Sequence, residues 1–399
     1  MVWERKGKDR AGEGEESMES AYRAALARLP GMSVLSLPKL ISLAGGSREL
    51  WEILARGGER AAALAGRDRA IAWARACDEK EPAEVLEELG RAGIRVIVPG
   101  DGLYPPLLAS IYDPPAVLFA RGKVPEADRP YVAVVGSRRA SGYGVFVAMT
   151  LGKELARHGI AVVSGAAYGV DGKAHQGCLR SGGYTVAVLG CGVDRVYPPG
   201  HASLLRQVAE QGCVLSEFPP GTKPLPWHFP YRNRIIAGLS HAVVVVEASR
   251  KSGALITAEI ALEEGREVMA VPGPIGNPLS LGTNGLIQKG AKLVMEIGDI
   301  CEELPWDVLS MLNPGLRGEK APPRADDGED ALSEVETACL ELLRGGPCSL
   351  DWLAAKTGQP AGELLSCLSS LTLRGLVGEE AGGRYMALPI MGETGERLI

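Results

Sequence analysis

Three loops of this sequence combine glycines, hydroxyl groups and arginines in an order that suits an anionic ligand. In the first loop, Gly136 follows an apolar run and permits a tight turn, and Ser137 and Arg138 come directly after it. Because a helix is expected to begin near residues 142–144, free N–H groups and a guanidinium would meet there and bind phosphate. The loop has neither the GxxxxGK[ST] nor the GxGxxG spacing of nucleotide-binding turns. An ordinary strand–helix turn with a surface arginine is the alternative.

The second loop covers residues 162–177 (VVSGAAYGVDGKAHQG). Ser164 and Gly165 allow another backbone to approach closely, and Asp171 is expected to cap the following helix. His175 would lie one turn inside that helix, where a structural role is favoured because no second ligand is near it in the sequence.

The third loop opens on prolines and aromatic residues and continues into Arg232, Asn233 and Arg234, where a helix is expected to begin. Prolines that hold aromatic faces beside arginines favour stacking of bases and neutralisation of phosphates, the two contributions to single-strand binding. Packing of Trp227 and Phe229 into the core is the alternative for these two rings.

The elements between these loops alternate strand and helix. Short, continuously apolar runs are typical of strands in a parallel sheet that is covered on both faces; they are expected at 132–135, 161–163, 185–189, 214–215, 242–246, 267–270 and 292–294. We therefore predict an α/β fold with a Rossmann-like, doubly wound, mainly parallel sheet. In such folds ligands bind beyond the carboxyl ends of the strands, which is where the three loops are expected.

The pattern changes on either side of this segment. The predicted order is a leader (1–17), a helical N-terminal domain resembling SAM or helix-hairpin-helix domains (18–90), the extended Rossmann-like domain (91–312), a flexible linker (313–330) and a winged-helix-like domain (331–390). The leader lacks the apolar core of a signal peptide, and no apolar run is long enough to cross a membrane. A cytoplasmic protein is expected.

Charge is distributed unevenly along the chain. The formal net charge is −6, yet residues 131–298 hold 16 Lys and Arg against 11 Asp and Glu. A basic middle is consistent with a nucleic-acid-binding surface confined to one domain. The eight cysteines are scattered singly, so the sequence predicts neither a metal site nor a cofactor, and buried thiols in a reducing compartment are expected.

Six segments closely resemble the DNA-processing protein A (DprA/Smf) family. They are 136–138 (GSR), 164–171 (SGAAYGVD), 187–201 (AVLGCGVDRVYPPGH), 216–224 (SEFPPGTKP), 229–240 (FPYRNRIIAGLS) and 252–273 (SGALITAEIALEEGREVMAVPG). They follow the order of the family, and the flanking segments at 104–115 and 332–388 are similar as well.

This resemblance implies a non-enzymatic protein that binds single-stranded DNA, forms homodimers and loads the recombinase RecA during natural transformation (competence) and recombination. By motif, Gly136, Ser137, Arg138, Arg232 and Arg234 would contact phosphate, Asn233 would hold its loop, and Phe229 would face the strand. The predicted DNA-binding set also contains Ser164, Gly165, Lys173 and Lys223, and Arg195 is a further candidate by position.

Two segments depart from the family pattern. His201 stands where an asparagine is usual, and Ser33 replaces the second glycine of a hairpin turn at residues 30–33, which weakens the expectation that the N-terminal domain grips DNA. The expected recognition helix of the winged helix, residues 361–373, has no Lys or Arg, so protein contact or dimer support is favoured over reading of the major groove.

Two other functions remain open from the sequence. Residues 252–259 loosely resemble the GGxGTxxE turn of nucleoside-monophosphate phosphoribohydrolases, which would make the chain a nucleotide-cleaving enzyme, although no acid–base pair is evident. A transcription factor acting through the winged helix is the third possibility, which the uncharged recognition helix disfavours.

Overall fold

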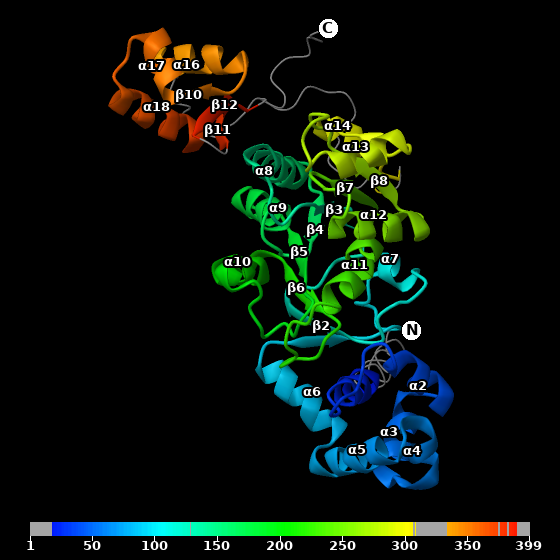
Figure 1. Ribbon diagram of the computed structural model, residues 1–399. Coiled ribbons are helices and arrows are strands. Elements are labelled where there is room, and N and C mark those ends of the chain that lie inside the picture. Colours follow the sequence, from blue (N-terminus) through cyan, green and yellow to red (C-terminus); the bar gives the residue numbers. More distant parts are fainter. Residues whose placement is uncertain are drawn as a thin grey trace, which may run out of the picture.

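The computed structural model describes residues 18–127, 129–305, 308, 333–373, 376–380 and 383–388. The predicted leader (1–17) and linker (313–330) lie outside these residues. Figure 1 shows helices at the N-terminal end (blue), a central sheet with flanking helices (cyan to yellow) and a small C-terminal unit (orange to red).

The central sheet has nine strands in the order β1-β2-β6-β5-β4-β3-β7-β8-β9. Strands β3 to β9 are parallel, whereas β1 and β2 are antiparallel additions at one edge. The bounds are β1 (Arg95–Ile97), β2 (Leu118–Gly122), β3 (Tyr131–Val135), β4 (Ala161–Ser164), β5 (Thr185–Val188), β6 (Cys213–Ser216), β7 (Ala242–Val245), β8 (Glu267–Ala270) and β9 (Lys292–Leu293). The chain winds from β3 to β6 in one direction and returns to β7 beside β3, which confirms the predicted doubly wound fold.

Helices cover both faces of this sheet (Figure 1). On one face Val132 and Val134 of β3 pack with α8 (Gly142–Arg157) and α9 (Val170–Arg180). On the other face Ala133 and Val135 pack with α11 (His228–Gly238) and α12 (Gly253–Glu263). Since both sets of alternating side chains are buried, the strands are apolar throughout, as the sequence pattern predicted. The remaining helices of this part are α7 (Pro106–Ala109), α10 (Ala202–Gln211), α13 (Leu281–Gln288), α14 (Ile297–Cys301) and the 3-10 turn η1 (Pro199–His201).

The N-terminal part is helical, as expected. A helix over residues 18–27 precedes α2 (Leu37–Ala44), α3 (Ser47–Arg56), α4 (Gly58–Ala65), α5 (Arg67–Glu79) and α6 (Pro82–Arg91). Their apolar sides share a core that includes Leu26, Leu50, Leu54 and Trp73, and Val96 of β1 extends this core to the edge of the sheet.

The C-terminal unit has three helices followed by a hairpin, an order that agrees with the expected winged helix. These are α16 (Glu334–Arg344), α17 (Leu350–Thr357), α18 (Ala361–Leu373), β11 (Val377–Glu380) and β12 (Arg384–Ala387), and β10 (Cys348–Ser349) completes a three-stranded sheet. The buried side of α18 carries Leu364, Leu368 and Leu371. Among the described residues, no helix has the length and apolar character needed to span a membrane.

Two local predictions were wrong. Residues 118–122, which were not among the expected strands, form β2. Helix α11 begins at His228 rather than at residues 231–234, because Pro230 falls within its first turn, where the missing N–H would have no helical partner.

Candidate nucleic-acid interface

The three loops converge on one pocket at the carboxyl ends of β4 and β5. Its walls come from four separate parts of the chain and consist of Arg138, Gly165, Ala167, Leu189, Gly190, Cys191, Tyr197, Pro198, Phe229 and Arg232. The guanidinium carbon of exposed Arg138 lies 5.2 Å from the centroid of the Phe229 ring. The Phe229 and Tyr197 rings lie 5.1 Å apart at an interplanar angle of 31°. A cation and two aromatic faces therefore share this pocket.

Arg232 is the second cation of the pocket, and it is only 4% exposed. Its Nη1 donates to the carbonyl oxygen of Gly165 at 2.9 Å and to that of Val188, and its Nε donates to Oδ1 of Asn233 at 3.1 Å. Burial lowers the pKa of Arg232 to about 10, with Arg138 adding to the lowering and Asp171 opposing it. The guanidinium is still charged near neutral pH, and Nη2 has no hydrogen-bond partner among the described residues.

Gly165 is required by this arrangement. A Cβ atom at this position would lie 2.1 Å from Nη2 of Arg232 and 2.5 Å from its Cζ. Any other residue would therefore displace the guanidinium. The predicted close approach at Gly165 is that of an arginine side chain of the protein itself.

Asp171 is buried in the first turn of α9 rather than placed at its cap. The N-cap residue is Gly169, whose φ of 76° suits glycine, and Asp171 is the second helical residue. Burial raises the pKa of Asp171, whereas the nearby Arg232 and hydrogen bonds from the backbone of Ala167 and Gly165 lower it. Asp171 thus holds the loop that carries Gly165, and the prediction of an N-cap role was wrong.

Two other residues of the predicted set, Ser164 and Asn233, have structural contacts. The hydroxyl of fully buried Ser164 donates to the carbonyl oxygen of Val134 at 2.6 Å. Asn233 is buried and accepts from Arg232, so it orients that side chain. The expected DNA contact of Ser164 is therefore revised to a hydrogen bond that links β4 to β3. The role of Asn233 is revised to positioning of the Arg232 side chain.

Arg234 does not line the pocket and instead forms ion pairs with one buried and one partly exposed carboxylate. Its guanidinium pairs with Glu217 at 2.9 Å and with Asp113 at 3.0 Å, and it lies 4.0 Å from the centroid of the Tyr231 ring. Burial raises the pKa of Glu217 to about 7, although Arg234 opposes this shift. Because Arg234 is paired with two carboxylates, the expected phosphate contact is corrected to an internal ion pair. Its buried Nη1 and Oε2 of Glu217 have no hydrogen-bond partner among the described residues.

The first loop supports the pocket through its backbone. The Ser137 N–H donates to the carbonyl oxygen of Glu247 at 2.7 Å, and the Val170 N–H donates to the carbonyl oxygen of Ser137 at 3.2 Å. A Cβ at Gly136 would lie 2.6 Å from Cγ2 of Val170, so glycine allows β3 and α9 to meet. Exposed Arg138 is presented from this fixed turn.

The usual anion site of the fold is already occupied. In doubly wound sheets a ligand phosphate binds where the strand order reverses, at the N-terminus of the following helix. Here that position, between β3 and β7, holds the buried carboxylate of Glu247, which accepts from the Ser141 N–H at 2.9 Å and from its hydroxyl at 2.6 Å. Since Glu247 fills this crevice, a nucleotide of the kind that Rossmann enzymes bind has no vacant anion site there.

Three further cations lie on the loops that follow β5 and β6 and on α9. Arg195 precedes Tyr197, and its Nη2 donates to the carbonyl oxygen of Gly221 at 3.1 Å, which links it to the loop of exposed Lys223. The half-buried Lys173 lies on α9 and donates to Oε1 of Gln176 at 3.1 Å. These three cations extend positive charge beyond the pocket walls.

One wall of the pocket, formed by residues after β5, was not expected from the sequence. Leu189, Cys191, Tyr197 and Pro198 line the pocket, although in the sequence they stand out only as part of the family segment 187–201. The signal that could have found Tyr197 is its position between Arg195 and two prolines, the same combination that drew attention to the third loop.

This fold and site define a class of protein. It is a doubly wound α/β protein with a pocket of cations and aromatic rings at the carboxyl ends of its central strands, and the crevice in which related folds bind nucleotides is filled by Glu247. Residues 95–305 match the family model for DNA recombination-mediator protein A, and residues 321–383 match the model for the DprA winged helix domain. The chain belongs to the DNA-processing protein A (DprA/Smf) family.

Individual relatives agree with this assignment. The chain is 46% identical over 222 residues to DNA processing protein DprA of Bacillus subtilis, covering 55% of this chain and 75% of the relative. It is 40% identical over 322 residues to a putative DprA of Mycobacterium tuberculosis, covering 77% and 80%. The crystal structure of DprA from Streptococcus pneumoniae superposes with a TM-score of 0.61 at 36% identity, covering 72% of this chain and 98% of that one.

Proposed function

We propose that this chain is a DNA-processing protein that binds single-stranded DNA in the pocket between Arg138, Phe229 and Arg232. The observation that carries the proposal is the position of the Arg138 guanidinium beside the Phe229 ring, with the buried cation of Arg232 in the same pocket wall. Single-strand binding combines phosphate neutralisation with base stacking on aromatic rings, and both groups are present here. Arg195, Lys223 and Lys173 would extend the path of the backbone.

Binding of oligo-dT tests this proposal. Fluorescence anisotropy at several salt concentrations should give a linear fall of log K with log salt, with a slope of about −0.7 per neutralised phosphate. Arg138→Ala should weaken binding and reduce the magnitude of the slope by about 0.7. Arg75→Ala is the matched control, because Arg75 is exposed on α5 of the N-terminal part and should leave the slope unchanged. A wild-type slope in Arg138→Ala would refute the site.

We further propose that the protein forms a homodimer and loads the recombinase RecA in the cytoplasm, as the family resemblance implies for natural transformation and recombination. Support for an interface comes from exposed apolar side chains after β7, where Leu262 is 60%, Ile275 88% and Met295 68% exposed.

Analytical ultracentrifugation of the wild type and of Leu262→Glu tests the self-association. The variant should shift the protein to monomer if this surface forms the dimer. RecA loading is tested separately, by following DNA strand exchange on oligo-dT-containing substrates coated with a single-strand-binding protein. If the chain binds oligo-dT but does not stimulate strand exchange by RecA, the proposed loading of RecA is refuted and the DNA-binding proposal still stands.

A further inference from the structure

Two turns at the carboxyl edge of the sheet carry cations that do not line the pocket. The turn after β3 carries Arg139, and the turn after β7 carries Arg250 and Lys251. All three side chains are exposed, and none of them forms an ion pair with another residue that the structure describes. The strand order β5-β4-β3-β7 places these turns next to the pocket, on the side of Arg138.

Main-chain hydrogen bonds join the two turns and fix their conformations. The Ser137 N–H in the first turn donates to the carbonyl oxygen of Glu247 at 2.7 Å. In the second turn the Ser252 N–H donates to the carbonyl oxygen of Ser249 at 3.0 Å, so the two cations occupy the central positions of a tight turn. Because this backbone is ordered before a ligand binds, the entropic cost of binding is lower.

The charge of this part of the sheet edge is positive. The loops after β3, β7 and β8 cover residues 136–141, 246–252 and 271–280, and their charged residues are Arg138, Arg139, Arg250, Lys251 and Glu247. The single carboxylate, Glu247, is 2% exposed and accepts from the Ser141 hydroxyl at 2.6 Å. The four cations therefore face solvent with their counter-charge buried beneath them.

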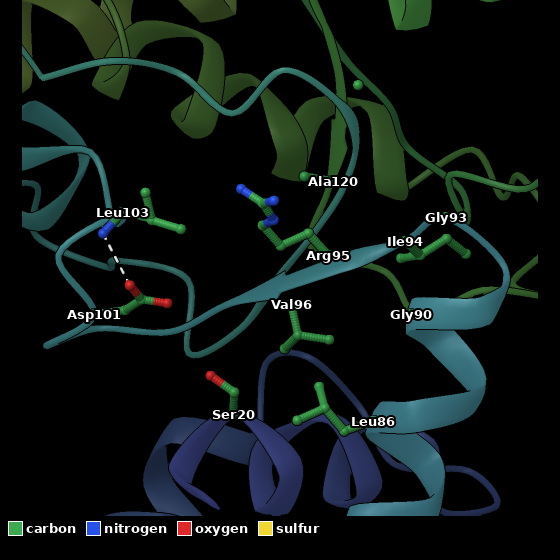
Figure 2. Close-up of a pocket in the computed structure, with 11 residues that line it drawn as sticks. Ser20, Leu86, Gly90, Gly93, Ile94, Arg95, Val96, Asp101, Leu103 and Ala120 are labelled. Atoms are coloured by element: carbon green, nitrogen blue, oxygen red, sulfur yellow. Dashed lines mark hydrogen bonds between the residues drawn. The ribbon is translucent and has the colours of Figure 1, made fainter. Parts of the chain in front are cut away.

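This excess of positive charge is local. A cavity between the N-terminal helices and β1, at the far end of the sheet, is shown in Figure 2. The charged residues of its lining are Arg95 and Asp101, one of each sign. The charges around that cavity are balanced, whereas those of the turns after β3 and β7 are not.

The residues of these turns suit phosphate groups rather than bases. The three loop segments contain arginine and lysine but no aromatic residue, so they offer charge without a stacking surface. Contacts of this kind position a nucleic acid and carry no sequence information. The pocket, by contrast, holds the rings of Tyr197 and Phe229.

We propose that a single DNA strand bound in the pocket continues over the turns after β3 and β7, where Arg139, Arg250 and Lys251 neutralise its phosphates. This inference rests on the proposed binding of single-stranded DNA in the pocket. The strand leaves the pocket past Arg138, which precedes Arg139 on the same turn. The turns lengthen the binding site without adding a sequence preference, because they contact the DNA backbone alone.

The salt dependence of oligo-dT binding by the full chain tests this path. An oligonucleotide of about 16 nucleotides, at the upper end of the site sizes of single-strand-binding domains, covers both the pocket and the turns. The double variant Arg250→Ala with Lys251→Ala should reduce the magnitude of the slope of log K against log salt by about 1.4, because two phosphate contacts are lost. When the salt concentration is raised fourfold, its affinity should fall by a factor about 7 times smaller than that of the wild type.

A double variant at the opposite edge of the sheet is the matched control. Lys153→Ala with Lys289→Ala removes the same number of charges, from the last turns of α8 and from the segment before β9. Both lysines are exposed and form no ion pair with a described residue. The slope of this control should equal that of the wild type.

A series of oligo-dT lengths separates the turns from the pocket. The shortest oligonucleotide that the wild type binds occupies the pocket. Strand β7 lies two strand spacings of about 4.8 Å from β4, and the Debye length at physiological salt is about 8 Å. The variant with Arg250→Ala and Lys251→Ala should therefore bind the shortest oligonucleotide with wild-type affinity at physiological salt, and should gain less affinity than the wild type as the length increases.

Several results would overturn the proposal. These are a wild-type slope in the variant with Arg250→Ala and Lys251→Ala, an equal loss of slope in the control, or a loss of affinity for the shortest oligonucleotide. If Arg138→Ala reduces the slope and the variant of the β7 turn does not, the pocket binds DNA and the path over the turns is refuted. If the wild type binds oligo-dT of no length, the proposed function itself fails.

Discussion

Replacement of Gly165 by alanine tests whether Arg232 must occupy its observed position. The new Cβ would lie 2.1 Å from Nη2, 2.5 Å from Cζ and 2.6 Å from Nη1 of Arg232, so the guanidinium has to move. It then loses its bonds to the carbonyl oxygens of Gly165 and Val188. Hydrogen bonds to charged groups contribute about 1.5–3 kcal/mol each, so about 3–6 kcal/mol depends on this position.

The expected result has two parts. The urea midpoint of unfolding should fall, and the slope of log K against log salt for oligo-dT should lose about 0.7 in magnitude, since one phosphate contact is removed. When the salt concentration is raised fourfold, the affinity of the variant for oligo-dT should therefore fall by a factor about 2.6 times smaller than the affinity of the wild type does. Gly276→Ala is the matched control, because a Cβ there meets no atom within 4 Å.

A double-mutant cycle assigns the effect to Arg232. If Gly165→Ala acts by displacing this side chain, it should cost little further oligo-dT affinity once Arg232 has been changed to alanine. An equal loss of affinity in both backgrounds, or a wild-type salt slope in Gly165→Ala, would refute the reasoning.

Three further outcomes are expected. Phe229→Leu should weaken oligo-dT binding by about 1–3 kcal/mol without changing the salt slope, because stacking is lost and charge is not; a changed slope would contradict this. Arg234→Met should lower the free energy of unfolding by about 3 kcal/mol or more, since it leaves Glu217 buried without its cation, yet it should leave the salt slope unaltered. Burial lowers the pKa of His175 to about 3, so the unfolded chain binds the extra proton first, and stability should fall by about 1.4 kcal/mol per pH unit as the pH drops below about 6.5. This dependence, followed by urea unfolding from pH 7 to pH 5, should be smaller in His175→Gln.

The order and type of the main elements could be predicted from the sequence. Continuous apolar strands separated by glycine-bearing turns indicate a sheet covered on both faces, and that pattern is local. The convergence of Arg138 and Phe229 also follows from the sequence in outline, because loops after parallel strands meet at one edge of a sheet.

What each polar side chain does was decided by tertiary contacts. Arg232 and Arg234 are two residues apart on α11, so they point to different sides of the helix, and nothing local indicates that Arg234 meets Glu217 and Asp113. The closing of the nucleotide crevice by Glu247 likewise depends on a contact between β7 and the start of α8. The sequence alone determined the pattern of strands and helices and which loops carry charge and aromatic rings, because these depend on neighbouring residues. The tertiary structure alone determined which charges are neutralised inside the protein and which can reach a ligand, because this depends on partners distant in the chain.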